Sequence, residues 1–242
     1  MHASNKPDPP TAQSFEVTGV YAAALHDLWH GSVGHTVRCV PTRRTVAVQV
    51  GERWLFGKWR RGRRADAAAE WRWLHLLPLL GIHTADPIAW IGRGDRSLLV
   101  TEGLPGRAMD AWAVAAADEG WLPEVVAYAC RVVAPVVRRL HDQHLVHRDL
   151  YWSHVFAADP RGDEAPALLD VERVFRPRWR WRRWVLKDLA GLWASVPVPV
   201  SPRAGLRFLR EYLGEPLGEH RGAIAAIVAK AARMRRHVPR YG

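Results

Sequence analysis

The order of the predicted secondary structure constrains the fold of this chain more than any other feature. Short runs of β-branched and aromatic residues predict three consecutive strands, at 36–40, 45–51 and 53–59. A helix at 65–80 follows, with Ala, Leu and Trp at helical spacing. Two more strands are expected after it, at 87–92 and 97–102. The first part of the chain is therefore expected to be a small, strand-rich unit with one helix.

The pattern changes after the glycine-containing break at 103–106. Apolar residues then recur at helical spacing, which predicts helices at 108–118, 121–144, 185–196, 203–213 and 219–237. Pro135 falls inside the longest of these helices and is expected to kink it. The runs VFAA and ALLDV predict a strand hairpin between the helices. A strand-rich half before a helix-rich half predicts an α+β, bilobal fold.

The expected domain organisation follows from this order. Residues 1–14 contain three prolines and few apolar residues, which predicts a disordered lead. We assign residues 15–103 to a β-rich, nucleotide-binding N-lobe and residues 104–242 to a mostly helical, catalytic C-lobe.

The charge of the chain indicates an anionic partner. The formal net charge is +11, and lysine occurs only at positions 6, 58, 187 and 230, so arginine supplies most of the positive charge. Nucleic acid, a phosphorylated substrate and an acidic membrane surface all fit this balance. Two isolated cysteines, Cys39 and Cys130, form neither a disulfide framework nor a zinc motif. No signal peptide or 18-residue apolar run is found, so we expect a cytoplasmic protein.

The stretch HRDLYWSH at 147–154, directly after the longest predicted helix, points to phosphoryl transfer. That reaction needs a cation for the phosphates, a carboxylate for Mg²⁺ and a second carboxylate for the attacking hydroxyl. Asp149 is expected to act on the hydroxyl, and Asp170, which ends the strand ALLD, to bind Mg²⁺. Lys58 on the third strand is expected to pair with Glu70 on the following helix and to contact the nucleotide phosphates.

Several neighbouring residues complete the candidate site. We group His147 and Arg148 with Asp149 as catalytic candidates, and Glu102 with the nucleotide-binding residues. His154 stands where the protein-kinase pattern has Asn. It is a metal-site candidate, although imidazole is a poorer Mg²⁺ ligand than oxygen, and the alternative is a hydrogen bond to the substrate or to Asp170.

Each of these residues also has an ordinary structural explanation. Asp149 and Asp170 are suitable turn caps, Lys58 belongs to a basic run, and Glu70 suits an exposed helix face. Asp188 either bonds the backbone of the catalytic loop or is a helix N-cap. The ordered set on matching elements favours the kinase-like interpretation.

Only 17 residues separate Asp170 from Asp188, which leaves no room for a long activation segment and favours a small-molecule or lipid-linked acceptor. This interval contains RVFRPRWRWRR, in which an extended strand would place Trp179 and Trp181 on one face. Arginine binds phosphate and tryptophan favours the bilayer interface, which suits an anionic glycolipid. The alternatives are a solvated basic loop with core-packed tryptophans and a groove for single-stranded nucleic acid. No nucleic-acid module accompanies the segment, so nucleic acid is not expected.

The strings HRDLYWSH, LLDVERV and KDLAGLW together resemble the lipopolysaccharide kinase (Kdo/WaaP) family. Tyr151, His154 and Arg173 fit the pattern, and the resemblance spans roughly residues 50–196. It implies a protein-kinase-like fold, ATP with Mg²⁺, and phosphorylation of a heptose or Kdo hydroxyl of the lipopolysaccharide inner core at the inner membrane. By this resemblance Asp149 is the catalytic base, Asp170 the metal ligand and Lys58 the nucleotide-phosphate contact.

The remaining assignments concern the acceptor and the partners. Substrate-binding candidates are Tyr151, Arg173, Arg176 and Arg178. We expect peripheral contact with the cytoplasmic face of the inner membrane, and no protein partner is inferred. Two other functions stay open: a different small-molecule phosphotransferase, and a non-catalytic kinase-like protein that binds glycolipid or nucleotide.

Overall fold

The computed structural model describes residues 21–62, 66–197, 200–214 and 216–236. The chain divides into two compact units, one of Met1–Trp71 with Asp86–Gly103 and the other of Arg72–Ala85 with Leu104–Gly242. The division at 103 coincides with the predicted break, but the segment 72–85 groups with the second unit. The predicted lead, 1–14, lies outside the described residues.

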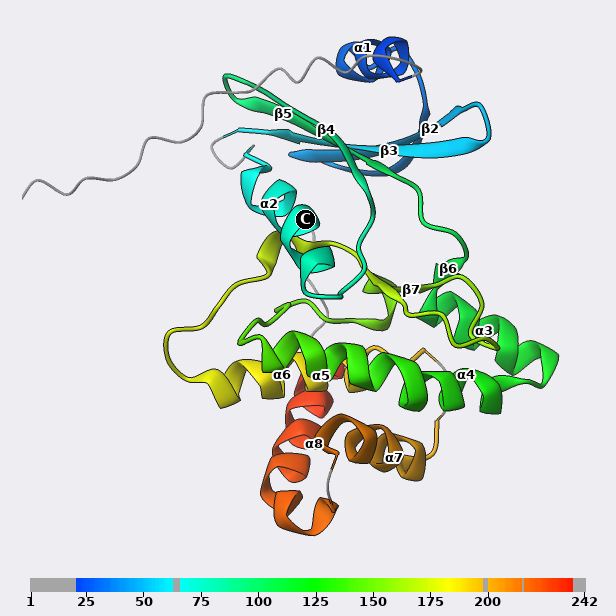
Figure 1. The fold of residues 1–242 in the computed structure, drawn as a ribbon, viewed down its shortest axis with the longest axis vertical. Helices are drawn as coiled ribbons and strands as arrows, with labels where there is room; N and C mark the ends of the chain where they lie inside the picture. Colours follow the sequence, from blue (N-terminus) through cyan, green and yellow to red (C-terminus); the bar gives the residue numbers. More distant parts are fainter. Residues whose placement is uncertain (1–20, 63–65, 198–199, 215, 237–242) are drawn as a thin grey trace, which may run out of the picture. The chain divides into compact units, whose positions relative to one another are not determined.

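A five-stranded antiparallel sheet dominates the first unit (Figure 1). Its strands are β1 (His35–Val40), β2 (Arg43–Val50), β3 (Arg53–Arg61), β4 (Pro87–Arg93) and β5 (Arg96–Glu102). Their order is β1-β2-β3-β5-β4, so β3 lies in the centre. All five strands agree with the sequence prediction to within two residues at each end.

One face of this sheet is covered by a helix that the sequence analysis did not predict. Helix α1 (Ala22–His30) buries Leu25 and Leu28 against the sheet. Gly57 on β3 makes room for this packing, since a Cβ there would lie 3.4 Å from Leu28 and closer still to two strand side chains. Gly31 ends this helix in a left-handed conformation.

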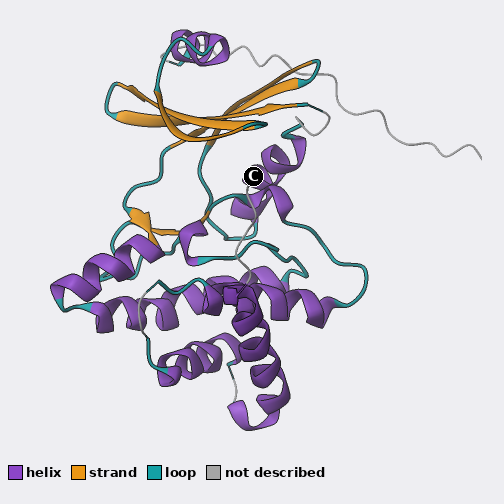
Figure 2. Ribbon diagram, turned by 180° about the vertical axis from the view of Figure 1, so that it is seen from behind, coloured by secondary structure: helices purple, strands orange, loops and turns teal. Residues whose placement is uncertain are grey.

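Helices make up most of the second unit (Figure 2). They are α3 (Met109–Glu119), α4 (Leu122–Tyr128), α5 (Ala134–Asp142), α6 (Trp181–Ala194), α7 (Pro202–Leu213) and α8 (Arg221–Arg236). Helix α2 (Ala68–Leu79) crosses the division, so its first turn belongs to the first unit. Short 3₁₀ segments lie at Trp152–His154, Val171–Arg173 and Leu217–His220. No helix in the described part of the chain has the length and apolarity needed to span a bilayer.

The long helix predicted at 121–144 is one helical run with a wider turn in it. The π-turn Ala129–Val133 separates α4 from α5, and the amide of Ala134 donates to the carbonyl of Ala129, five residues before. Pro135 then falls in the first turn of α5. The wider turn therefore lies directly before the proline, which has no N–H to continue the regular helical hydrogen-bond ladder.

The predicted hairpin is present as a small antiparallel sheet with strand order β6-β7-β8. Its strands are β6 (Arg107–Ala108), β7 (Val155–Ala157) and β8 (Ala167–Leu168). HRDLYWSH runs between α5 and β7, and the next part of the candidate site follows β8. Strand β7 therefore follows the segment that carries Asp149, and its partner β8 precedes the segment that carries Asp170.

The segment 173–183 is not the extended strand in which Trp179 and Trp181 would share one face. Arg180 adopts a left-handed conformation with φ 56°, and α6 starts at Trp181, four residues before the predicted helix. Trp181 packs against the rings of His141 and His144, whereas Trp179 is 81% exposed. The two tryptophans therefore do not share a face, because the packing of Trp181 stabilises a helix over the alternating pattern.

Candidate active site

In the first unit, the alternation of β3 places Lys58 and Arg60 on the same face. Both side chains reach Glu70 in the first turn of α2. The Lys58 Nζ lies 2.6 Å from Oε1 of Glu70, and the Arg60 guanidinium bonds the other carboxylate oxygen. Glu70 is 1% exposed, so these cations compensate the charge of a buried carboxylate. The expected Lys58–Glu70 pair is present, and Arg60 is an additional member.

Glu102 does not join this pair. It ends β5 and forms an ion pair with Arg53, with 3.0 Å between Nη1 and Oε2. Its backbone amide donates to the carbonyl of Asp86. The role of Glu102 in nucleotide binding stays a prediction.

In the second unit, two cations contact the carboxylate of Asp149. The Arg173 Nη1 lies 2.7 Å from Oδ2, and the Lys187 Nζ lies 3.4 Å from Oδ1. The Asp149 side chain is 18% exposed, so it is partly accessible to a ligand. Of the three groups, the sequence analysis had assigned roles to Asp149 and Arg173.

The backbone on either side of Asp149 is held firmly. His147 is buried, and its Nε2–H donates to the carbonyl of Leu169 at 2.9 Å. Burial lowers the pKa of His147, so this imidazole is neutral near pH 7. Arg148 has φ 71°, and its guanidinium lies over the rings of Phe175 and Trp184, 5.6 and 5.4 Å from their centroids. Among the catalytic candidates, His147 and Arg148 thus make structural contacts next to Asp149.

His154 connects the loop to the next carboxylate. Its Nδ1–H donates to the backbone carbonyl of Asp149 at 2.7 Å, and its Nε2 lies 4.0 Å from Oδ2 of Asp170. Because a carbonyl only accepts, Nδ1 carries the proton of this hydrogen bond, and Nε2 faces Asp170. Asp170 itself has φ 55°.

Asp188 is buried in the middle of α6 and is not an N-cap. Its Oδ2 accepts the backbone N–H of His147 at 2.7 Å and lies 3.4 Å from Nε2 of His141. The Nδ1 of His141 lies 2.8 Å from the hydroxyl of Tyr212. Desolvation raises the pKa of Tyr212, so this hydroxyl keeps its proton and donates it.

The other substrate candidates lie further from Asp149. Tyr151 packs edge-on against the ring of His154. Arg176 is exposed, with one bond from Nη2 to the carbonyl of Gln143 at 3.4 Å, and Arg178 is exposed. The structure therefore brings Asp149, His154, Asp170 and Arg173 together in the second unit, and Lys58 with Glu70 in the first.

A comparison with known protein families identifies the family of the chain. Residues 58–212, well over half of the chain, match the lipopolysaccharide kinase (Kdo/WaaP) family. The chain belongs to this family. The family identifies it as a phosphotransferase of the lipopolysaccharide kinase class.

Curated relatives and solved structures agree with the family. The lipopolysaccharide core heptose(I) kinase WaaP of Escherichia coli is 27% identical over 232 residues, covering 84% of this chain and 88% of that protein. The K12 protein of the same name is 28% identical over 214 residues, covering 76% and 79%. A structure of WaaP in complex with acyl carrier protein has a TM-score of 0.69 at 26% identity, covering 87% of this chain and 96% of that one.

An aminoglycoside-3'-phosphotransferase of type VIII shares the fold. Its TM-score is 0.58 at 21% identity, with 86% of this chain and 98% of that chain covered. The expected α+β, kinase-like fold is thereby confirmed.

The sequence analysis did not name two residues that lie beside the candidate residues of the second unit, Lys187 and Glu172. Oxygens of the Asp170 and Glu172 carboxylates lie within 4.8 Å of one another. Glu172 follows the metal candidate by two residues, and the 3₁₀ turn at Val171–Arg173 brings its side chain back. Lys187 had a signal in composition, because lysine occurs only four times in this arginine-rich chain.

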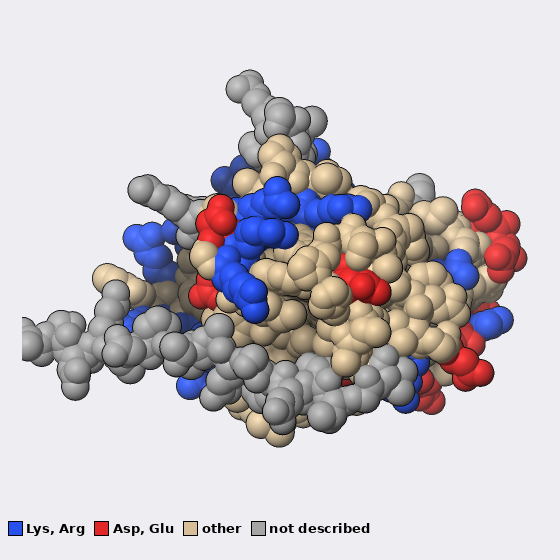
Figure 3. Space-filling model, turned by 90° about the horizontal axis from the view of Figure 1, so that it is seen from above, with Lys and Arg blue, Asp and Glu red and all other residues tan. Residues whose placement is uncertain are grey.

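Basic side chains also gather on the outside of the protein. Figure 3 shows Lys and Arg grouped on the face that it presents. The first unit contributes exposed arginines from four strands, namely Arg38, Arg43, Arg44, Arg53, Arg61 and Arg93. Part of the positive charge therefore lies on exposed arginines of the sheet, at positions that are distant from Asp149 in the sequence.

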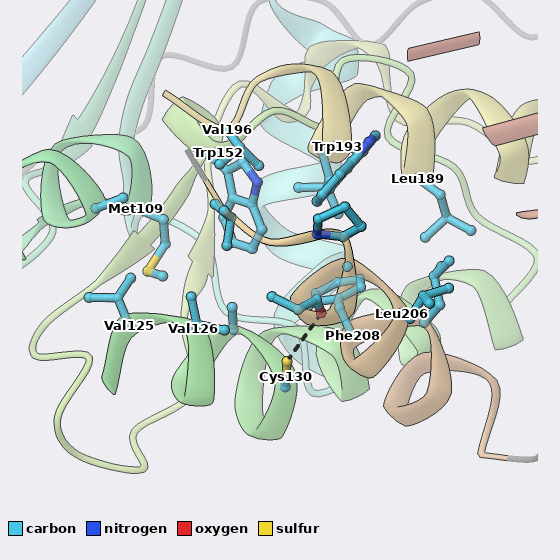
Figure 4. A pocket seen from close by; sticks show the side chains of 18 of the residues that line it. Met109, Val125, Val126, Cys130, Trp152, Leu189, Trp193, Val196, Leu206 and Phe208 are labelled. Atoms are coloured by element: carbon cyan, nitrogen blue, oxygen red, sulfur yellow. Dashed lines mark hydrogen bonds between the residues drawn. The ribbon is translucent and has the colours of Figure 1, made fainter. Parts of the chain in front are cut away.

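The second unit also contains an apolar pocket of about 230 Å³ (Figure 4). Helices α3, α4, α6, α7 and α8 line it together with Trp152, and the side chains include Met109, Val126, Trp193, Phe208 and Val228. Cys130 lies at its floor, with Sγ 4.0 Å from the carbonyl of Ala204. Desolvation raises the pKa of this thiol. The sequence did not indicate the pocket, because its lining has the spacing of ordinary helix core.

Proposed function

We propose that this protein is an ATP-dependent kinase that phosphorylates a sugar hydroxyl, heptose or Kdo, of the lipopolysaccharide inner core or of a similar anionic glycolipid. The observation that carries the proposal is the environment of Asp149. A partly accessible carboxylate lies between two cations and is joined through His154 to a second carboxylate, Asp170. This is the arrangement that transfer of an anionic group to a hydroxyl requires.

Asp149 would accept the hydrogen bond of the acceptor hydroxyl and take its proton as the new bond to phosphorus forms. Arg173 holds one carboxylate oxygen and so fixes the direction of the other. His154 holds the carbonyl of the same residue, which restricts the backbone. Orientation of this kind is a large part of phosphoryl-transfer catalysis.

The residues fit ATP and Mg²⁺. Mg²⁺ prefers oxygen ligands, and the carboxylates of Asp170 and Glu172 supply oxygens close to one another. The metal would neutralise charge on the phosphates. Lys58, held by the buried Glu70, would contact the phosphates from the first unit.

The decisive experiment is incubation with ATP, Mg²⁺ and a panel of lipopolysaccharide cores, read by mass spectrometry for added phosphate. We expect Asp149→Asn and Asp170→Ala to abolish transfer while the fold survives. Asp163→Asn is the matched control, because this carboxylate is 82% exposed and pairs only with Arg131 among the described residues.

The outcomes separate the competing functions. Transfer to a soluble sugar but to no lipopolysaccharide core would favour another small-molecule phosphotransferase. Glycolipid binding without transfer, with Mg²⁺ supplied, would indicate a non-catalytic binding protein and contradict the proposal.

We further propose that the segment 173–183 contacts an anionic bilayer from the cytoplasmic side. Trp179 is 81% exposed, and Arg176 and Arg178 beside it are exposed. Tryptophan is favoured at the bilayer interface, and each arginine near an anionic surface adds about 1 kcal/mol. Trp179→Ala should weaken sedimentation with phosphatidylglycerol vesicles, whereas Trp54→Ala, also exposed at 42%, should not. Equal weakening by both would contradict this role.

The apolar pocket favours a second partner, which the sequence analysis did not infer. The related WaaP structure is a complex with acyl carrier protein. We propose that acyl carrier protein binds this chain and that its acyl chain occupies the pocket, since the lining is almost entirely apolar and an acyl chain has the matching chemistry.

Thermal unfolding with purified carrier protein tests this proposal. At 100 times its dissociation constant, acyl carrier protein should raise Tm by about 5–10 °C, and the same carrier without an acyl chain should raise it much less. Val228→Glu at the pocket should reduce the shift, whereas Val114→Glu, equally exposed but outside the lining, should not. Equal stabilisation by both carrier forms would contradict acyl-chain binding.

A further inference from the structure

Lys187 contacts the proposed catalytic carboxylate but has no assigned role. It lies in α6, one residue before the buried Asp188, and its side chain is 25% exposed. Its Nζ reaches Oδ1 of Asp149 at 3.4 Å, whereas Arg173 occupies Oδ2 at 2.7 Å. The two cations thus meet opposite oxygens of one carboxylate, and the lysine contact is the longer.

A purely structural ion pair is a poor explanation for the position of Lys187 beside Asp149. Desolvation by burial lowers the pKa of Lys187, so its charge is held there at a cost that Asp149 and Asp188 only partly offset. Arg173 already balances the charge of Asp149 at shorter distance. A second ammonium at 3.4 Å adds little to holding the loop.

The hydrogen-bond donors of the Lys187 ammonium are consistent with a bound anionic ligand. An ammonium has three N–H donors, and in the described part of the chain the only hydrogen bond of Nζ goes to Asp149. Two donors therefore remain beside the carboxylate that would receive the acceptor hydroxyl. Half-buried donors of this kind are satisfied by water or by an anionic ligand.

We propose that Lys187 is a catalytic residue whose ammonium contacts the oxygens of the phosphoryl group in transit. The inference rests on the proposed function. The acceptor oxygen bonds to the γ-phosphorus of ATP as the bond from that phosphorus to the bridging oxygen breaks. The electron pair leaves with ADP, and the hydroxyl proton passes to Asp149. Lys187 keeps its protons and stabilises the negative charge on the phosphoryl oxygens.

Two substitutions separate this role from a structural one. Lys187→Met removes the charge and keeps the shape, and we expect kcat to fall about 100-fold with both KM values changed less than threefold. Lys187→Arg keeps the charge and should retain far more activity than the methionine variant. Lys230→Met on α8 is the control and should leave kcat unchanged. Tm is measured for each variant.

The pH profile provides a second readout. The charged groups that face Lys187 are Asp149, Asp188 and Arg173. Its lowered pKa means that the active, protonated form is lost as pH rises, so kcat should fall on the alkaline side. In Lys187→Arg that alkaline fall should move to higher pH, because arginine does not titrate there.

The results distinguish this inference from the proposed function. Transfer by the wild type with kcat of Lys187→Met within threefold, or with only KM raised, would overturn the role of Lys187 alone. The role would also be overturned if kcat fell equally in Lys187→Met and Lys187→Arg and the alkaline fall of kcat stayed at the same pH in Lys187→Arg. No transfer by the wild-type chain to any core would overturn the proposed function and this inference with it.

Discussion

Substitution of Asp188 should destabilise the second unit strongly. Its Oδ2 accepts the buried backbone N–H of His147 at 2.7 Å, and the Asp188 side chain is fully buried. A hydrogen bond to a charged group contributes about 1.5–3 kcal/mol, and the N–H left without a partner adds its desolvation cost. For Asp188→Ala we therefore expect a loss of about 3–5 kcal/mol. For a chain of this length that lowers Tm by roughly 10 °C.

Asp188→Asn should be intermediate. The amide oxygen can still accept from His147, but the charge is lost and the NH₂ group replaces an oxygen, Oδ1, that has no hydrogen-bond partner in the described structure. A loss of about 2 kcal/mol is expected. Asp163→Ala, at an exposed carboxylate, serves as the control.

Scanning calorimetry and thermal circular dichroism measure these changes. The reasoning would be refuted if Asp188→Ala kept Tm within 2 °C of the wild type, a margin below the roughly 6 °C expected at the lower bound. It would also fail if the asparagine variant were destabilised as much as the alanine variant, because the retained acceptor would then contribute nothing.

Three further predictions follow from other contacts. Gly191→Ala should abolish phosphate transfer, since a Cβ there would lie 2.6 Å from the backbone carbonyl oxygen of Leu150, directly after Asp149; unchanged kcat would contradict this close approach. Glu70→Gln should raise the KM for ATP about tenfold, because a buried charge partner of Lys58 is lost; steady-state kinetics test it. Acidification from pH 7 to 5 should lower Tm, because the pKa of buried His147 is lowered and the unfolded chain binds the extra proton below about pH 6.5. His147→Gln should reduce this fall in Tm between pH 7 and pH 5.

The sequence predicted the parts of the fold that depend on local periodicity. Alternation along 53–59 located β3, and a period of two placed Lys58 on the face opposite Leu55. Helix α1 was missed because it is only nine residues long and buries just Leu25 and Leu28. So short an apolar pattern is recognisable only once the sheet that covers it is known.

The missed features depend on tertiary contacts. The sequence predicted a helix only from 185, but Trp181 stacks on His144 and Trp184 packs against Phe175, and these contacts stabilise an earlier start of α6. The apolar pocket cannot be distinguished from core in the sequence, since a residue such as Phe208 has the same helical spacing in either case. The periodicity around Lys187 does not reveal its role, because its contact Asp149 lies 38 residues away in the sequence.

The backbone around Asp149 explains why the residue types were easier to predict than their geometry. Arg148 and Asp170 both have positive φ, at 71° and 55°, a conformation that costs non-glycine residues about 1–3 kcal/mol each. No local pattern predicts such a conformation, because it exists only while surrounding contacts enforce it. Those contacts are the rings over which Arg148 lies, the bond from Leu169 to the carbonyl of His154, and the Asp188 acceptor for His147. Since these groups fix the direction of Asp149 without touching a reacting atom, changes in them should lower kcat through position alone, with the chemical groups intact.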